Sequence, residues 1–123
     1  MVSLVTDAGI ANATEAWDGS ATRARHVAWG TGSGQGVTDT DLATAAGEAR
    51  TAGTTSRQTT TTANDTYRVT GTITATSGHA ITEVGVFTAT SGANLAIYGD
   101  FSAINLNIGD SISFTIDTIF DQA

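Results

Sequence analysis

Glu83 has the most unusual surroundings of any carboxylate in this sequence, because it lies within the apolar run Ala80–Thr88. An acid flanked by Ile81 and Val84 could have a raised pKa and serve as a general acid. Alternatively, the side chain faces solvent or pairs with an arginine on a neighbouring strand, such as Arg68. We favour this second interpretation, because glutamate is rarely buried without a partner.

The two histidines indicate neither a catalytic triad nor a metal site. His79 and Glu83 are four residues apart, a spacing that brings side chains together on a helix but not on a strand. Gly32-Ser33-Gly34 is too short to match the nucleophile elbow Gly-x-Ser-x-Gly, and the chain has no cysteine. We therefore expect no enzymatic activity, metal ion or cofactor. Three later aspartates also lack the spacing of a calcium loop: Asp100, Asp110 and Asp117.

A glycine-rich segment follows the short strand expected over residues 25–29. Such a loop can cradle phosphate when it opens a helix and a lysine follows. Here the chain contains no lysine, and the acidic stretch Val37–Asp41 comes next. The sequence therefore predicts a flexible surface loop rather than a nucleotide site. Its residues are Gly30, Thr31, Gly32, Ser33, Gly34, Gln35 and Gly36.

The elements that position these residues are best defined at the end of the chain. Apolar and polar residues alternate on both sides of a turn signal at Gly109-Asp110, which predicts two strands joined as a hairpin. One face of this hairpin should be core and needs a second sheet to cover it. Its apolar residues are Ile104, Leu106, Ile108, Ile112, Phe114 and Ile116.

Similar alternation predicts further strands. Residues 67–75 place one apolar face opposite a threonine-rich face. Residues 80–88 are apolar at both parities, so either both faces are buried or Gly85 marks a bulge. A turn at Thr90–Gly92 leads to a strand over 94–101, and the threonine-rich tract 50–62 is expected to form an edge ribbon.

Helix signals are confined to the first part of the chain. Residues 4–16 suit a short helix capped by Thr6 or Asp7 and ended by Asp18-Gly19-Ser20. A second short helix is expected over residues 38–48. The two tryptophans could stack on sugars or bases, but we expect Trp29 to lie in the core and Trp17 to form a helix–sheet contact.

These elements predict a mainly β protein, an antiparallel β-sandwich or jelly roll with one or two short helices in its N-terminal third. We expect a single domain over residues 1–123, with an N-terminal helix or arm (1–22) and a sandwich (23–123). The net charge is -7, which argues against a nucleic-acid partner. No apolar run could span a membrane, and no signal peptide is evident, so synthesis in a cytoplasm is expected.

Several short blocks, in this order, resemble small structural proteins of tailed-bacteriophage virions. The most specific are Ile81–Phe87 and Ile108–Ser111. The resemblance extends over most of the chain from about residue 4. The other blocks are Val27–Gly32, Thr38–Leu42, Glu48–Arg50, Asn64–Tyr67 and the sequence around the second specific block, Asp100–Ile116.

This resemblance implies a capsid cement or decoration protein, which binds the outer head surface and stabilises contacts between capsomers. Its partners would be the major capsid protein and a second or third copy of itself. A small tail-collar or tail-fibre protein is the alternative, although the short chain favours cement. A glycan-binding sandwich is a further alternative. The expected contact residues are those of the glycine-rich loop together with Val2, Ser3, Leu4 and Val5.

Overall fold

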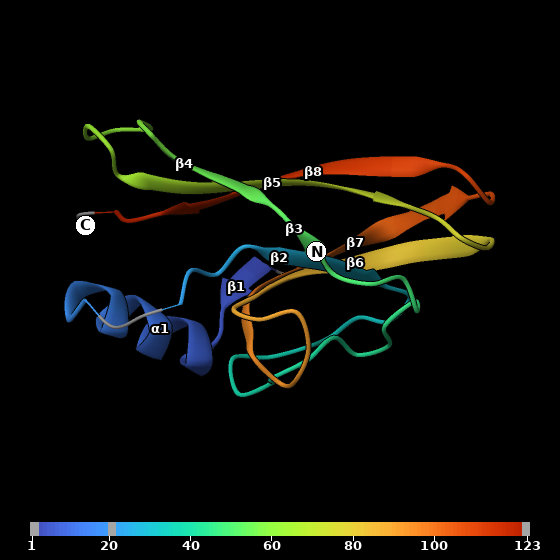
Figure 1. Cartoon of the computed structure of the whole chain (residues 1–123), viewed down its shortest axis with the longest axis horizontal. Coiled ribbons are helices and arrows are strands. Elements are labelled where there is room, and N and C mark those ends of the chain that lie inside the picture. The colour runs from blue at the N-terminus through green and yellow to red at the C-terminus, as the bar shows by residue number, and fades with distance from the viewer. Residues whose placement is uncertain (1–2, 20–21, 122–123) are drawn as a thin grey trace.

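The computed structural model describes residues 3–19 and 22–121 as two antiparallel β-sheets with one helix beside them (Figure 1). One sheet has the strand order β1-β7-β6-β2-β3, and the other has the order β4-β5-β8. The architecture confirms the expected mainly β, antiparallel sandwich. In chain order the elements are β1 (Ser3–Val5), α1 (Asp7–Trp17), β2 (His26–Gly30), β3 (Thr51–Ala52), β4 (Thr54–Gln58), β5 (Thr66–Thr74), β6 (His79–Phe87), β7 (Leu95–Leu106) and β8 (Ser111–Ile119).

The core lies between the two sheets. Trp29 of β2 is buried as expected, and its ring meets the edge of the Phe114 ring with centroids 6.4 Å apart. Ile112, Phe114 and Ile116 point inward from β8 and pack half-buried against the core, while the alternate residues of β8 are exposed. In β6, every residue from Glu83 to Phe87 is buried, so both of its faces are covered.

The prediction that the strands on either side of Gly109-Asp110 pair as a hairpin is wrong, although both strands exist. β7 pairs with β6 and β1, whereas β8 pairs with β5 in the other sheet. Gly109, with a φ of +89°, lies in a turn that crosses from one sheet to the other. Alternation fixes which residues face inward, but it does not say whether two consecutive strands pair with or face each other.

The second expected helix, over residues 38–48, is also wrong. The segment instead crosses the end of β2, where Thr31 donates its amide to the Thr44 carbonyl (2.9 Å) and Gly30 forms an isolated bridge with Ala45. Leu42 is buried against the five-stranded sheet. Backbone groups of this segment, which would bond to one another in a helix, instead form hydrogen bonds with distant parts of the chain.

Helix α1 begins as expected with Thr6 as its N-cap, whose side chain accepts the amide of Gly9 (3.0 Å). The Thr6 hydroxyl also donates to the carbonyl of Leu95 (2.5 Å), which fixes the first turn of the helix to β7. The far end of the helix extends beyond the five-stranded sheet, toward the side of the molecule where the β4–β5 loop lies (Figure 1). Trp17 lies at this end and is 96% exposed, so the expected helix–sheet contact is wrong.

Arg50 holds the loop between β6 and β7. Its guanidinium donates to the carbonyls of Ala89 (3.0 Å) and Gly92 (2.7 Å) and to the Asn94 side chain (3.1 Å). It also lies 3.5 Å from the centre of the Phe87 ring, in cation–π geometry. One side chain from outside the hairpin therefore satisfies several groups of the loop.

We expect Arg50→Ala to lower the free energy of unfolding by about 2 kcal/mol, because it removes these hydrogen bonds and the ring contact. Urea unfolding followed by tryptophan fluorescence measures the change. Arg57→Ala is the matched control, because Arg57 is exposed on the edge strand β4. Equal effects of the two substitutions would contradict the assigned role of Arg50.

Candidate interaction surface

Glu83 is completely buried, so the interpretation that it faces solvent or pairs with Arg68 is wrong. One carboxylate oxygen accepts the amide of Ala43 (3.0 Å) and the hydroxyl of Tyr98 (3.0 Å). The other accepts the amides of Thr44 (2.9 Å) and Gly32 (3.2 Å). Burial, followed by the hydrogen bond to Glu83, raises the pKa of Tyr98 well above its usual range. The carboxylate therefore links two loop segments to the sheet.

Glu83 and a second carboxylate, that of Asp100, hold the glycine-rich loop in place. The amide of Gly34 bonds to Asp100 (3.1 Å), and the Thr82 hydroxyl donates to the carbonyl of Gly32 (2.6 Å). A Cβ atom on Gly30 would collide with the Glu83 carboxylate, which explains why this position lacks a side chain. Because Gly32 and Gly34 already donate their amides to carboxylates of this chain, those amides are not free to bind a phosphate.

The N-terminal segment forms the edge strand β1. It pairs with β7 in a register that places Leu4 opposite Tyr98 and Ser3 opposite Gly99. Leu4 packs half-buried beside Tyr98, against a second hydrophobic cluster separate from the core between the sheets. Val2, which we also expected to contact a partner, lies outside the described residues.

The structure brings the two predicted contact segments together. Tyr98 pairs with Leu4 on one side and bonds through Glu83 to Gly32 on the other. The carbonyl of Val37, just after the loop, accepts the Asp7 amide at the start of α1 (2.8 Å). We call this combination of β1, the first turns of α1 and residues 30–37 the loop–helix surface.

The predicted residues contribute unequally to this surface. Ser3, Thr31, Ser33 and Gly34 are exposed, and Gly30 is buried. Sequence reasoning missed its two large apolar side chains, Ile10 (58% exposed) and Val37 (50% exposed). An apolar valine in an otherwise polar loop was the available signal. The remaining predicted residues are half-buried: Leu4, Val5, Gly32, Gln35 and Gly36.

A second polar cluster surrounds Glu48, whose side chain is 5% exposed. Its carboxylate accepts the Trp29 indole N–H (2.9 Å) and the Thr76 amide (2.9 Å), and lies 2.8 Å from His79 Nε2. Burial by itself would raise the pKa of Glu48, but these hydrogen bonds outweigh it and lower the pKa to about 2. The cluster joins the core tryptophan to the end of β5 and the start of β6.

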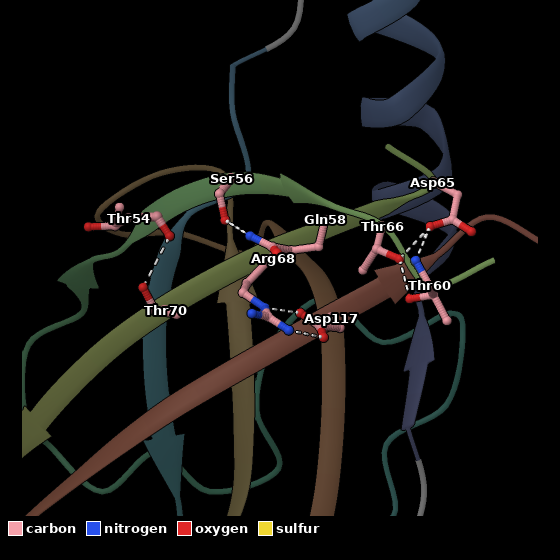
Figure 2. A network of polar contacts seen from close by, with 9 residues as sticks. All are labelled: Thr54, Ser56, Gln58, Thr60, Asp65, Thr66, Arg68, Thr70 and Asp117. Carbon is pink, nitrogen blue, oxygen red and sulfur yellow. Dashed lines mark hydrogen bonds and ion pairs between the residues drawn. The ribbon is translucent and has the colours of Figure 1, made fainter. Parts of the chain in front are cut away.

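The outer face of the three-stranded sheet is rich in hydroxyl groups (Figure 2). Arg68 of β5 and Asp117 of β8 form a two-bond ion pair at 2.8 and 2.9 Å, with both side chains about one-third exposed. At one end of this sheet, hydrogen bonds from the amides of Thr60, Thr62 and Thr61 hold the pKa of Asp65 below its usual range. The hydroxyl face is thus an ordered polar surface.

Within residues 3–19 and 22–121, no group of three or more acidic, histidine or cysteine side chains could hold a metal ion. In the same part of the chain, no helix has the length and apolar character needed to cross a membrane.

Comparisons with protein-family models, curated proteins and solved structures find no match to this chain.

Proposed function

We propose that this protein is a non-enzymatic structural protein of a phage virion, of the capsid cement or decoration type. In this proposal it is made in the host cytoplasm, binds the major capsid protein on the outer head surface and stabilises contacts between capsomers. The observation that carries the proposal is the loop–helix surface, which unites the two segments that the sequence indicated as contact residues.

The construction of this surface suits a binding role. Glu83 and Asp100 hold the loop through its backbone amides, so little conformational entropy remains to be lost when a partner binds. Ile10 and Val37 add exposed apolar side chains to the loop–helix surface, which a partner could cover. Many copies on a capsid lattice would add avidity even if each contact were weak.

The test is binding to phage heads that lack the decoration protein, measured by co-sedimentation. We expect the natural protein to bind and to raise the temperature at which the heads release DNA. Ile10→Asp and Val37→Asp should each weaken binding at least about tenfold, because each places a charge in the apolar contact. Ile104→Asp is the matched control, since Ile104 is also exposed but lies on β7, outside the surface.

Failure of the natural protein to bind these heads would overturn the cement proposal. Immunogold labelling of complete particles separates the remaining possibilities. Label distributed over the head supports the proposal, whereas label confined to the tail would replace it with the tail-collar or tail-fibre assignment.

A further inference from the structure

Strand β8 leaves a long edge of the three-stranded sheet unpaired within the described chain. It has nine residues and pairs with β5 without interruption from Ser111 to Ile119. The other outer strands of the described sheets are shorter, with three residues in β1, two in β3 and five in β4. β8 is therefore the described edge with the greatest capacity to add another strand.

This edge lacks the usual protection against pairing. Proteins guard exposed edges with proline, lysine, bulges or very short strands. This chain has neither proline nor lysine, and the β5–β8 register contains no bulge. The one charged side chain of β8, Asp117, is already paired with Arg68.

Large apolar side chains are exposed at both ends of β8. Ile108, just before the strand, is 73% exposed, and Phe120, just after it, is 62% exposed. An antiparallel partner strand runs in the opposite direction, so it brings the beginning of one copy beside the end of the other. A second copy of β8 would thus bring Ile108 of one copy and Phe120 of the other to the same end of the pair.

We propose that two copies of this protein pair through β8 in antiparallel orientation, about a two-fold axis at Phe114. The pairing would join the two three-stranded sheets into one continuous six-stranded sheet. This pairing rests on the proposed function, because it identifies the surface through which the protein would associate with itself. It can be tested on the purified protein, without phage heads. Across the axis the β8 register opposes Phe114 with Phe114, Ile112 with Ile116, Ser113 with Thr115, and Ser111 with Asp117, while Ile108, in the turn before the strand, lies at the same end of the pair as Phe120 of the other copy.

This register is compatible with the charges on the strand. Asp117 faces the neutral Ser111 of the partner, and no acidic side chain of β8 lies directly opposite another. The inward residues meet apolar with apolar, so the core layer continues across the axis. The remaining electrostatic cost is the long-range repulsion between two chains of net charge -7, which salt screens.

The area is that of a weak, reversible dimer. A strand of this length extends about 30 Å, and one sheet with its side chains is about 10 Å deep, which gives about 300 Å² per copy. The total of about 600 Å² lies below the range of stable complexes, so we expect the association to be weak. β1 and β8 also border a groove of about 560 Å³ on this side of the sandwich, which the second copy would face.

Sedimentation equilibrium of the purified protein, from about 1 μM to about 300 μM, tests the association. We expect a monomer–dimer equilibrium that shifts toward dimer as the salt concentration rises. Ile108→Asp and Phe120→Lys should each weaken the dimer at least about tenfold when studied alone. Trp17→Ser, which also removes an exposed apolar side chain but on α1, should leave the equilibrium unchanged.

Mixing the two weakened variants tests the antiparallel orientation. At one end of the mixed dimer the introduced aspartate and the introduced lysine would lie together, and at the other end the original isoleucine and phenylalanine would remain together. We expect the mixture to recover the dimer. Residues 108 and 120 are both exposed, so we expect both variants to fold, and circular dichroism checks this.

Disulfide cross-linking is an independent readout, because the natural chain has no cysteine. A mixture of Ser113→Cys and Thr115→Cys proteins should form the mixed disulfide faster than either protein forms its own. A natural protein that stays monomeric throughout the concentration range would overturn the proposal. A dimer that neither weakens in the charged variants nor cross-links at these positions would overturn the β8 interface.

Discussion

Replacing Glu83 with alanine should destabilise the fold more than any other single substitution considered for this chain. The change leaves three partly buried backbone amides and the buried Tyr98 hydroxyl without their acceptor, and it opens a cavity. Each unpaired buried donor costs about 1–3 kcal/mol, so we expect a loss on the order of 5 kcal/mol. Urea unfolding monitored by circular dichroism measures it.

Two milder substitutions provide a graded comparison. Glu83→Gln keeps the shape but turns one acceptor into a donor that faces donors, so an intermediate loss of about 3 kcal/mol is expected. Tyr98→Phe removes a single hydroxyl and should cost about 1 kcal/mol. If Glu83→Gln were as stable as the natural protein, the carboxylate would not be what holds residues 30–45 in place.

Glu48 should make the protein sensitive to acid. Its pKa is about 2 in the folded chain and 4.5 ordinarily, so the folded state favours the charged form. The resulting stabilisation is fully present above about pH 5 and is lost as the pH falls from 4.5 toward 2. The difference between the two pKa values corresponds to at most about 3 kcal/mol.

Unfolding free energies measured at intervals from pH 7 to pH 2 test this expectation. Glu48→Gln should be less stable at neutral pH and should lose less stability on acidification than the natural protein. The comparison isolates Glu48, because the carboxylates of Asp65 and Asp117, whose pKa values are also lowered, remain in both proteins. Parallel pH curves for the two proteins would refute the assignment.

Local pattern in the sequence was sufficient to predict most of the elements. Thr6 supplied the cap of α1, and period-two alternation identified the inward residues of β5 and β8. What it could not supply was pairing between distant segments. The turn at Gly109-Asp110 resembles a hairpin turn, yet its strands belong to different sheets, because partner choice depends on residues far away in the chain.

The candidate surface was only partly predictable for the same reason. The glycine-rich loop and the N-terminal segment stood out by composition and position, but their junction at Tyr98 and Glu83 depends on segments from five parts of the chain. The helix expected over residues 38–48 failed where Glu83 takes the amides of Ala43 and Thr44. No feature near residue 43 in the sequence indicates that an acid forty residues later will bind there.

The pairing of β1 with β7 also bears on how the chain can fold during synthesis. The first strand has its partners at residues 97–99, and the cap of the only described helix bonds to Leu95. A nascent chain that has left the ribosome only up to residue 90 therefore cannot yet pair β1 with β7 or bond Thr6 to Leu95. Sandwich closure consequently follows the synthesis of β7, and the N-terminal segment stays available for other contacts until residues 95–99 have left the ribosome.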